Sequence, residues 1–202
     1  MVMPRKGQEP VVREPFDLPA FKLEVQGLVE SGILGEFVET LGPVSLEDIE
    51  NLKRRYASLI IQLDRLRPAL AAANVTARGK DGAWSIKEMI GHLIDADRDI
   101  WWPRIEALLR DEARSPKRPH FADIDHHTLV REHGWQSQPL EDILAQFVRA
   151  RWHYAMNLNA ISPSEFERCG EHAVLGEICI LRMVQILVAH DAHYLAKINA
   201  MI

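Results

Sequence analysis

Apolar residues recur at helical spacing along most of the chain after Ser45. Steps of four and three residues separate six apolar positions that fall on one stripe of a helix: Leu52, Tyr56, Leu59, Leu63, Leu66 and Leu70. Ser45, followed three residues later by Asp48, forms a capping-box pattern at the start of this helix. The pattern predicts a first helix that ends before the polar stretch 74–82.

A second helix is predicted from Ser85 to about Asp111. Ser85 and Glu88 form a clear capping box at its start. Pro103 lies inside this helix, and a proline removes one backbone hydrogen bond, so we expect a kink near Asp99.

Two further helices are predicted, at about 140–159 and from about 175 to the C-terminus. A long polar loop, 113–138, precedes the third helix, and loops of this length often border a site. No alternating strand pattern is present. Four amphipathic helices predict an all-α fold, a four-helix bundle over residues 45–202.

Residues 1–44 differ from the rest of the chain. Four prolines in the first 20 residues favour an extended tail, and apolar positions over 21–40 suggest one or two short helices that end at Gly42-Pro43. We therefore expect a tail with a short N-terminal helical extension (1–44), followed by one bundle domain (45–202).

Composition narrows the class of protein. With 202 residues, 47% of them apolar, the chain suits one domain with a full core, and its formal charge of -5 argues against nucleic acid as a partner. No apolar run approaches about 18 residues, so no membrane span is expected. Cys169 and Cys179 lack C-x-x-C spacing, and we expect reduced thiols in the core of a cytoplasmic protein.

Histidines lie on the predicted inner faces of two helices. His190 is at the centre of the apolar stripe of the last helix, and His193 and Tyr194 share that face. His92 lies on the second helix, where a polar face meets an apolar one. Two helices of a bundle can each present a histidine to one metal ion, although a lone core histidine is more often bonded to a neighbour.

Arg151 interrupts the apolar stripe of the third helix. A buried guanidinium needs an acid or an anion. Either Asp95, Asp99 or Asp191 supplies that acid and Arg151 is structural, or Arg151 binds an anionic group of a ligand. The remaining histidines of the long loop are expected to be solvated, and nothing in the sequence selects one for the site: His120, His126, His127 and His133.

Two segments carry a resemblance to a known family. The run Trp84-Ser-Ile-Lys-Glu-Met-Ile-Gly-His92-Leu-Ile-Asp95 resembles the second-helix signature of the DinB-like and YfiT-like metal-dependent enzymes. The run His190-Asp-Ala-His-Tyr-Leu-Ala-Lys-Ile198 resembles their last helix. The similarity covers roughly residues 50–202.

The resemblance implies a divalent metal ion, nickel or zinc, bound by one histidine of the second helix and two of the last helix at i and i+4. Carried over to this chain, the ligands are His92 and His190, with Tyr194 in the third place. A tyrosine there is a departure, because a phenol with a pKa near ~10 is a reluctant ligand. His193 lies one residue earlier on the same face and is the other candidate.

Two activities follow from the resemblance. A small-molecule substrate is hydrolysed by water activated at the metal, or a low-molecular-weight thiol is transferred to an electrophile, as in bacillithiol S-transferases and mycothiol-dependent isomerases; we favour the thiol reaction slightly. Asp95 is expected to orient His92 or act as a base, and Arg151 to meet a carboxylate. The alternative is a non-catalytic bundle with a degenerate metal site. Such a bundle would bind a ligand or form a homodimer.

Overall fold

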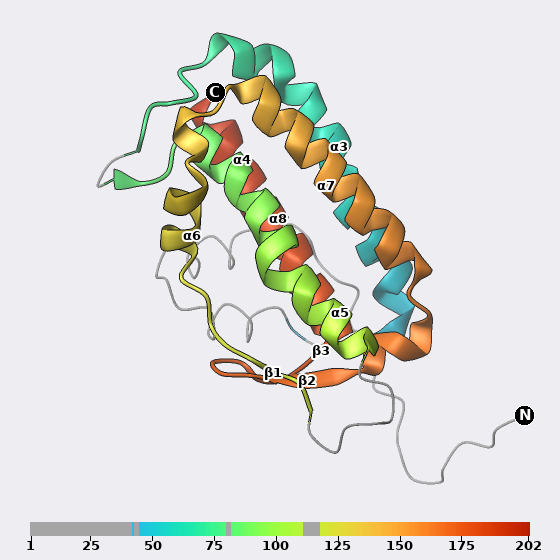
Figure 1. Ribbon diagram of the computed structural model, residues 1–202. Helices are drawn as coiled ribbons and strands as arrows, with labels where there is room; N and C mark the ends of the chain where they lie inside the picture. The colour runs from blue at the N-terminus through green and yellow to red at the C-terminus, as the bar shows by residue number, and fades with distance from the viewer. Residues whose placement is uncertain (1–41, 43–44, 80–81, 111–117) are drawn as a thin grey trace, which may run out of the picture.

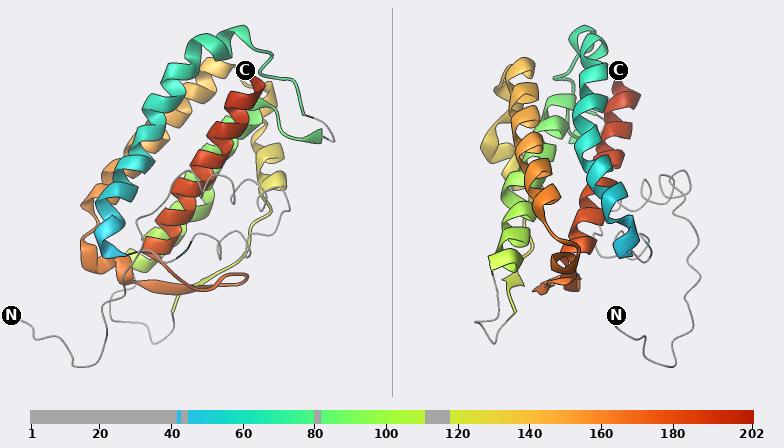
Figure 2. Two further views of the ribbon diagram at one scale, coloured as in Figure 1. Left: turned by 180° about the vertical axis from the view of Figure 1, so that it is seen from behind. Right: turned by 90° about the vertical axis from the view of Figure 1, so that its right-hand side faces the viewer.

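The computed structural model describes residues 42, 45–79, 82–110 and 118–202, and four long helices dominate it (Figure 1). They are α3 (Ile49–Ala72), a second helix that begins with α4 (Ile86–Asp95), α7 (Leu140–Ala160) and α8 (Ile180–Met201). Helices α3 and α4 each pack against both α7 and α8, so they occupy opposite corners of the bundle (Figure 2). The predicted four-helix bundle is confirmed.

The predicted capping box of Ser85 and Glu88 is formed with both of its bonds, and the one at Ser45 is formed in half, through the side chain of Asp48. Asp48 accepts hydrogen bonds from the backbone N–H and the hydroxyl of Ser45, at 3.0 and 2.8 Å, and a 3-10 turn (Leu46–Asp48) leads into α3. Glu88 accepts from the backbone N–H and the hydroxyl of Ser85, each at 2.9 Å. These bonds satisfy groups at the helix start that have no partner inside the helix, and they fix where the helices begin.

The second helix continues through a π-helical segment (Ala96–Trp101) into α5 (Trp102–Arg110). The N–H of Trp102 bonds to the carbonyl of Asp97, five residues earlier. Proline has no N–H, and here the expected kink takes the form of this wider turn just before Pro103. The extra residue in the turn changes which side chains face the bundle interior.

Three short strands form a small sheet at one end of the bundle (Figure 1), and the sequence pattern did not predict them. Strand β2 (Cys169–His172) pairs in parallel with β1 (His120–Phe121) and in an antiparallel hairpin with β3 (Gly176–Cys179). The hairpin turn uses Gly176 at a φ of 67°. The predicted start of the last helix near residue 175 is therefore wrong, because that segment is strand and α8 begins at Ile180.

The two cysteines correct a second expectation. Cys169 and Cys179 are partners in the β2–β3 register and form a disulfide bond, so they are not reduced thiols. Their separation of ten residues is the length of the hairpin that brings them opposite each other. The pairing was missed because the two strands of this hairpin were not predicted. The predicted cytoplasmic location stays a prediction.

The predicted long loop contains its own short elements, helix α6 (His126–His133) and a 3-10 turn (Trp135–Ser137). Asp125 caps α6, and Gly134 ends it at a φ of 62°. Helix α6 lies beside α4 (Figure 1). A further 3-10 turn (Pro163–Glu167) connects α7 to the sheet.

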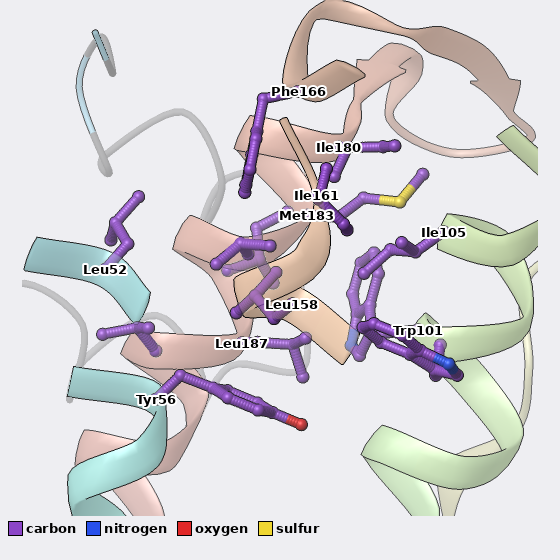
Figure 3. Packing of buried hydrophobic residues seen from close by; sticks show 14 of the residues in the cluster. Leu52, Tyr56, Trp101, Ile105, Leu158, Ile161, Phe166, Ile180, Met183 and Leu187 are labelled. Carbon is purple, nitrogen blue, oxygen red and sulfur yellow. The ribbon is translucent and has the colours of Figure 1, made fainter. Parts of the chain in front are cut away.

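Apolar side chains from the four bundle helices fill the interior in two clusters. The cluster nearer the sheet is shown in Figure 3, where Tyr56, Trp101, Leu158 and Leu187 approach one another from four helices. None of the described helices has the length and apolarity that a membrane span requires. The predicted extension (1–44) lies outside the described residues except Gly42, so the two-part division stays a prediction.

Candidate metal centre

His92 and His190 face each other across the bundle. His92 comes from α4 and His190 from α8, and their Nε2 atoms lie 2.8 Å apart. The ring centroids are 4.8 Å apart at an angle of 62°. His92 is 1% exposed and His190 is partly buried, so the structure places these two predicted ligands together at the edge of the core.

Both imidazoles are neutral at ordinary pH. Burial lowers the pKa of His92 well below its ordinary value, and the neighbouring histidines, His190 first, lower it further. Burial also lowers the pKa of His190, with His126, His193 and Arg151 adding to the effect. Among the described residues, the Nδ1 atoms of His92 and His190 have no hydrogen-bond partner. Neutral imidazole is the form that binds metal.

Tyr194 and Trp84 line the same site. The Tyr194 ring lies 5.0 Å from that of His92 and 4.8 Å from that of His190, centroid to centroid. The ring centroid of Trp84, just before α4, lies 4.6 Å from that of His92 and 5.9 Å from that of Tyr194. Burial raises the pKa of Tyr194 well above its ordinary value, so this side chain is a neutral phenol. A phenol in this state is a poor ligand.

His193, the other candidate for the third ligand, is 4% exposed. Its ring contacts Tyr194 at 5.1 Å, but none of the ring contacts in the described part joins it to His92 or His190. Burial lowers the pKa of His193 to about 4, with Lys197 adding to the effect, and its Nε2 has no partner. It therefore borders the site without touching the histidine pair.

His126, which sequence reasoning left among the solvated loop residues, lies at the site. Its ring centroid is 5.2 Å from that of His92 in an edge-on arrangement. Burial lowers its pKa. The one available signal was its position directly after Asp125, a capping residue that predicts a short helix inside the loop.

A second group of potential ligands lies next to the histidine pair on the same helix. Within the described ranges, one set of three acidic or histidine side chains has ligand atoms within 4.8 Å of one another: Asp95, Asp99 and His133. The guanidinium of Arg98 already occupies this group, since it contacts Asp99 at 2.9 Å and Asp95 at 3.4 Å. Its positive charge balances part of the negative charge of this group.

Asp95 does not bond to His92, contrary to its predicted orienting role. Its two oxygens accept from the indole N–H of Trp135 at 2.8 Å and meet Nδ1 of His133 at 2.9 Å. Asp95 is fully buried and joins the α6 segment to α4. The predicted catalytic role of Asp95 stays a prediction that this geometry does not favour.

Arg151 is fully buried and bonded to acids on two helices. Its Nε donates to Asp97 at 2.9 Å, and its other two nitrogens bond to both oxygens of Asp191. Burial raises the pKa of Asp97 to about 7 against the charge of Arg151. This arrangement favours the structural alternative, with Asp191 the expected partner and Asp97 an unexpected one; binding of a ligand anion by Arg151 stays a prediction.

The residues present fit a divalent metal ion at the histidine pair. Two imidazoles from different helices, neutral because burial lowers their pKa, present their Nε2 atoms to each other, and imidazole nitrogen is a common ligand of zinc. The orphaned Nδ1 atoms show that the pair is not part of a closed structural network.

Comparison with known proteins finds relatives whose names refer to a metal ion. The protein named putative metal-dependent hydrolase OB0782, from Oceanobacillus iheyensis, is 21% identical over 183 residues, which are 91% of this chain and 94% of that protein. A second protein of that organism, named putative metal-dependent hydrolase OB0413, is 22% identical over 168 residues, 77% of this chain and 86% of that protein. These names and the Asp/Asp/His group suggest a metal ion.

Structure and family comparisons identify the fold. YfiT from Bacillus subtilis, described as a probable metal-dependent hydrolase with an unusual four-helix bundle topology, superimposes with a TM-score of 0.66 at 15% identity, covering 79% of this chain and 88% of that one. The family model of the DinB superfamily matches residues 46–198. The chain therefore belongs to the DinB superfamily.

Proposed function

We propose that this protein is a metal-dependent hydrolase whose divalent ion, nickel or zinc, is held by His92 and His190. The observation that carries the proposal is the 2.8 Å approach of two Nε2 atoms from neutral imidazoles on different helices. A divalent ion bound there would lower the pKa of water, which is the chemistry a hydrolase needs.

The histidine pair is a better metal site than the acidic group beside it. Asp95 and Asp99 are neutralised by Arg98, and Asp95 also holds Trp135. A cation there would have to displace a guanidinium. At the histidine pair, an ion would replace a single imidazole–imidazole hydrogen bond.

The chain itself supplies the surroundings for the reaction. Trp84 packs against His92 and Tyr194 packs against His190, and the two rings provide aromatic surface for a small-molecule substrate. The hydroxyl of Tyr194 remains protonated, so it can donate a hydrogen bond to a substrate oxygen without competing as an anion. The names of the relatives support hydrolysis over the thiol transfer that was favoured from the family resemblance.

The test begins with metal content. Untagged full-length protein is purified and its nickel and zinc are measured, beside His92→Ala, His190→Ala and the control His153→Ala, which removes an exposed histidine of α7. We expect about one ion per chain in the wild type and the control and a loss in the other two variants. Absence of bound metal under any divalent supply would overturn the proposal in favour of a non-catalytic bundle.

Activity then separates the two reactions. Metal-loaded protein is assayed for hydrolysis of p-nitrophenyl esters and, separately, for conjugation of bacillithiol to chlorodinitrobenzene. Hydrolysis that disappears in His190→Ala supports the hydrolase. Conjugation without hydrolysis would replace it with a thiol transferase at the same site.

A further inference from the structure

The α6 segment, which is helix α6 with the following 3-10 turn (residues 126–137), is held against α4 by contacts on either side of His92. Gly91 touches the Trp135 ring so closely that a Cβ atom at residue 91 would lie 2.1 Å from the indole Cγ. Asp95, three residues after His92, accepts from the Trp135 indole N–H at 2.8 Å and bonds to His133 at 2.9 Å. Packing and hydrogen bonds therefore fix this loop segment at the height of the histidine pair.

The clamp carries the first residue of α6 to the site. Asp125 accepts from the backbone N–H groups of His127 and Thr128, at 3.0 and 3.2 Å, which sets the start of α6. His126 is then turned toward His92, whereas its neighbour His127 is exposed and contacts Trp84 at 4.9 Å. Two adjacent histidines thus have different surroundings.

Two of the three ring separations that a shared ion needs are present among the described residues. Imidazoles that bind one tetrahedral ion at metal–nitrogen distances of about 2.0–2.1 Å have ring centroids about 5 Å apart. The separations here are 4.8 Å for His92–His190 and 5.2 Å for His92–His126. In the described part of the chain, His193 has no ring contact with either member of the pair.

We propose that His126 is the third metal-binding residue, supplied by the loop and positioned by the clamp of Gly91, Asp95 and Trp135. This inference rests on the proposed metal site at His92 and His190. The ring nitrogens of His126 do not form a set with those of the pair within 4.8 Å, so coordination requires rotation of the partly exposed ring. Tyr194 then need not bind the ion.

Cobalt binding to the full-length protein tests the assignment. Metal-free wild type, His126→Ala and the matched control His127→Ala are titrated with Co²⁺ against a chromophoric chelator. We expect His126→Ala to weaken binding by at least about 100-fold, since loss of even an outer partner of a ligand costs 10–100-fold. His127→Ala should stay within a few-fold of wild type. Wild-type affinity in His126→Ala would overturn the inference.

A cysteine in place of His126 provides a second test, in which coordination adds an absorption band instead of lowering the affinity. In His126→Cys, a coordinating thiolate would add a charge-transfer band in the near-ultraviolet spectrum of the cobalt protein, and His127→Cys should lack it. If the band is absent from His126→Cys although this variant still binds cobalt through His92 and His190, the third ligand lies elsewhere. Failure of wild type to bind cobalt at all would instead overturn the proposed function.

The clamp has its own test. Gly91→Ala removes no ligand, yet the added methyl must push Trp135 away, and we expect cobalt affinity to fall by about 10–100-fold. In a His126→Ala background the same change should have almost no further effect, because the ligand that the clamp positions is already gone. Equal losses in both backgrounds would show a general structural effect and overturn the positioning role.

Discussion

Two polar groups lie inside this bundle, and they differ in how fully their hydrogen-bonding atoms are used. The first is the arginine network, which takes one residue from each bundle helix: Tyr56, Asp97, Arg151 and Asp191. Arg151 bonds through all three guanidinium nitrogens, the Tyr56 hydroxyl donates to Asp97 at 2.8 Å, and the Tyr56 ring lies 4.1 Å from the guanidinium carbon.

The second group, at the histidine pair, leaves nitrogen atoms without partners. The Nε2 atoms of His92 and His190 contact each other, and in the part of the chain that the structure describes their Nδ1 atoms and the Nε2 of His193 are unpaired. Buried polar atoms normally find partners, so a closed network indicates a structural role and an open one indicates a place for a ligand. The two groups are neighbours, since Asp191 follows His190 directly on α8.

The largest expected effect on stability comes from removing Arg151 from the arginine network. Arg151→Ala leaves Asp97 and Asp191 buried without their counter-ion, and we expect the free energy of unfolding to fall by about 3–5 kcal/mol. Urea unfolding followed by circular dichroism measures it. Arg151→Met combined with Asp97→Asn and Asp191→Asn should recover much of this loss. A loss below about 1 kcal/mol in Arg151→Ala would remove the structural role.

The arginine network also shows what the sequence could predict. Its apolar surroundings marked Arg151 as a buried cation, and Asp191 was among the expected partners. Asp95 and Asp99 were the other two candidates, on the second helix. Asp97 is instead the acid that reaches the guanidinium, and it follows the buried residues Leu93 and Ile94 by four and three positions on the inner face of this helix. Helical spacing places Asp97 on that face, but which acid meets Arg151 across the bundle depends on tertiary packing.

The sequence predicted the histidines of the site that lie on long helices, but not the one in the loop. His92 and His190 lie on amphipathic helices whose inner faces follow from periodicity. The position of His126 depends instead on the contact between Gly91 and Trp135, two residues that are far apart in the sequence. The hairpin that pairs Cys169 with Cys179 escaped prediction for a similar reason, since its four-residue strands show no clear alternation.

An intermediate effect on stability is expected when zinc binds at the histidine pair. At a free zinc concentration 100 times the dissociation constant, wild type should gain about 2.7 kcal/mol of stability, and EDTA should remove it. His190→Leu should show no gain. Its metal-free stability should stay within about 1 kcal/mol of wild type, because the lost imidazole had an unpaired nitrogen.

Thermal and urea unfolding with and without zinc provide both numbers. A metal-free His190→Leu protein that is destabilised as strongly as Arg151→Ala would contradict the distinction between the two groups. Zinc stabilisation of His190→Leu equal to that of wild type would show that the ion binds elsewhere, and the acidic group around Asp95 would be the first place to examine.

The smallest expected effect concerns Glu88, a fully partnered acid one turn before His92 on α4. Burial alone would raise its pKa, but hydrogen bonds from Ser85 and the charge of Arg78 outweigh burial, and the pKa is lowered below its ordinary value. A carboxyl whose folded pKa is lowered adds stability above its unfolded pKa of about 4.3, and this contribution is lost as pH falls through the folded value.

Glu88→Gln should therefore lower stability by about 1 kcal/mol near neutral pH, the usual contribution of a helix cap. The difference between wild type and variant should begin to shrink as pH falls below about 4.3, and it should be smallest below the lowered folded pKa, where Glu88 is neutral in both states. Urea unfolding from pH 7 to pH 3 measures it. A difference independent of pH would show that Glu88 acts through packing alone, and a closed hydrogen-bond set would then be a weaker sign of structural role than Arg151 suggests.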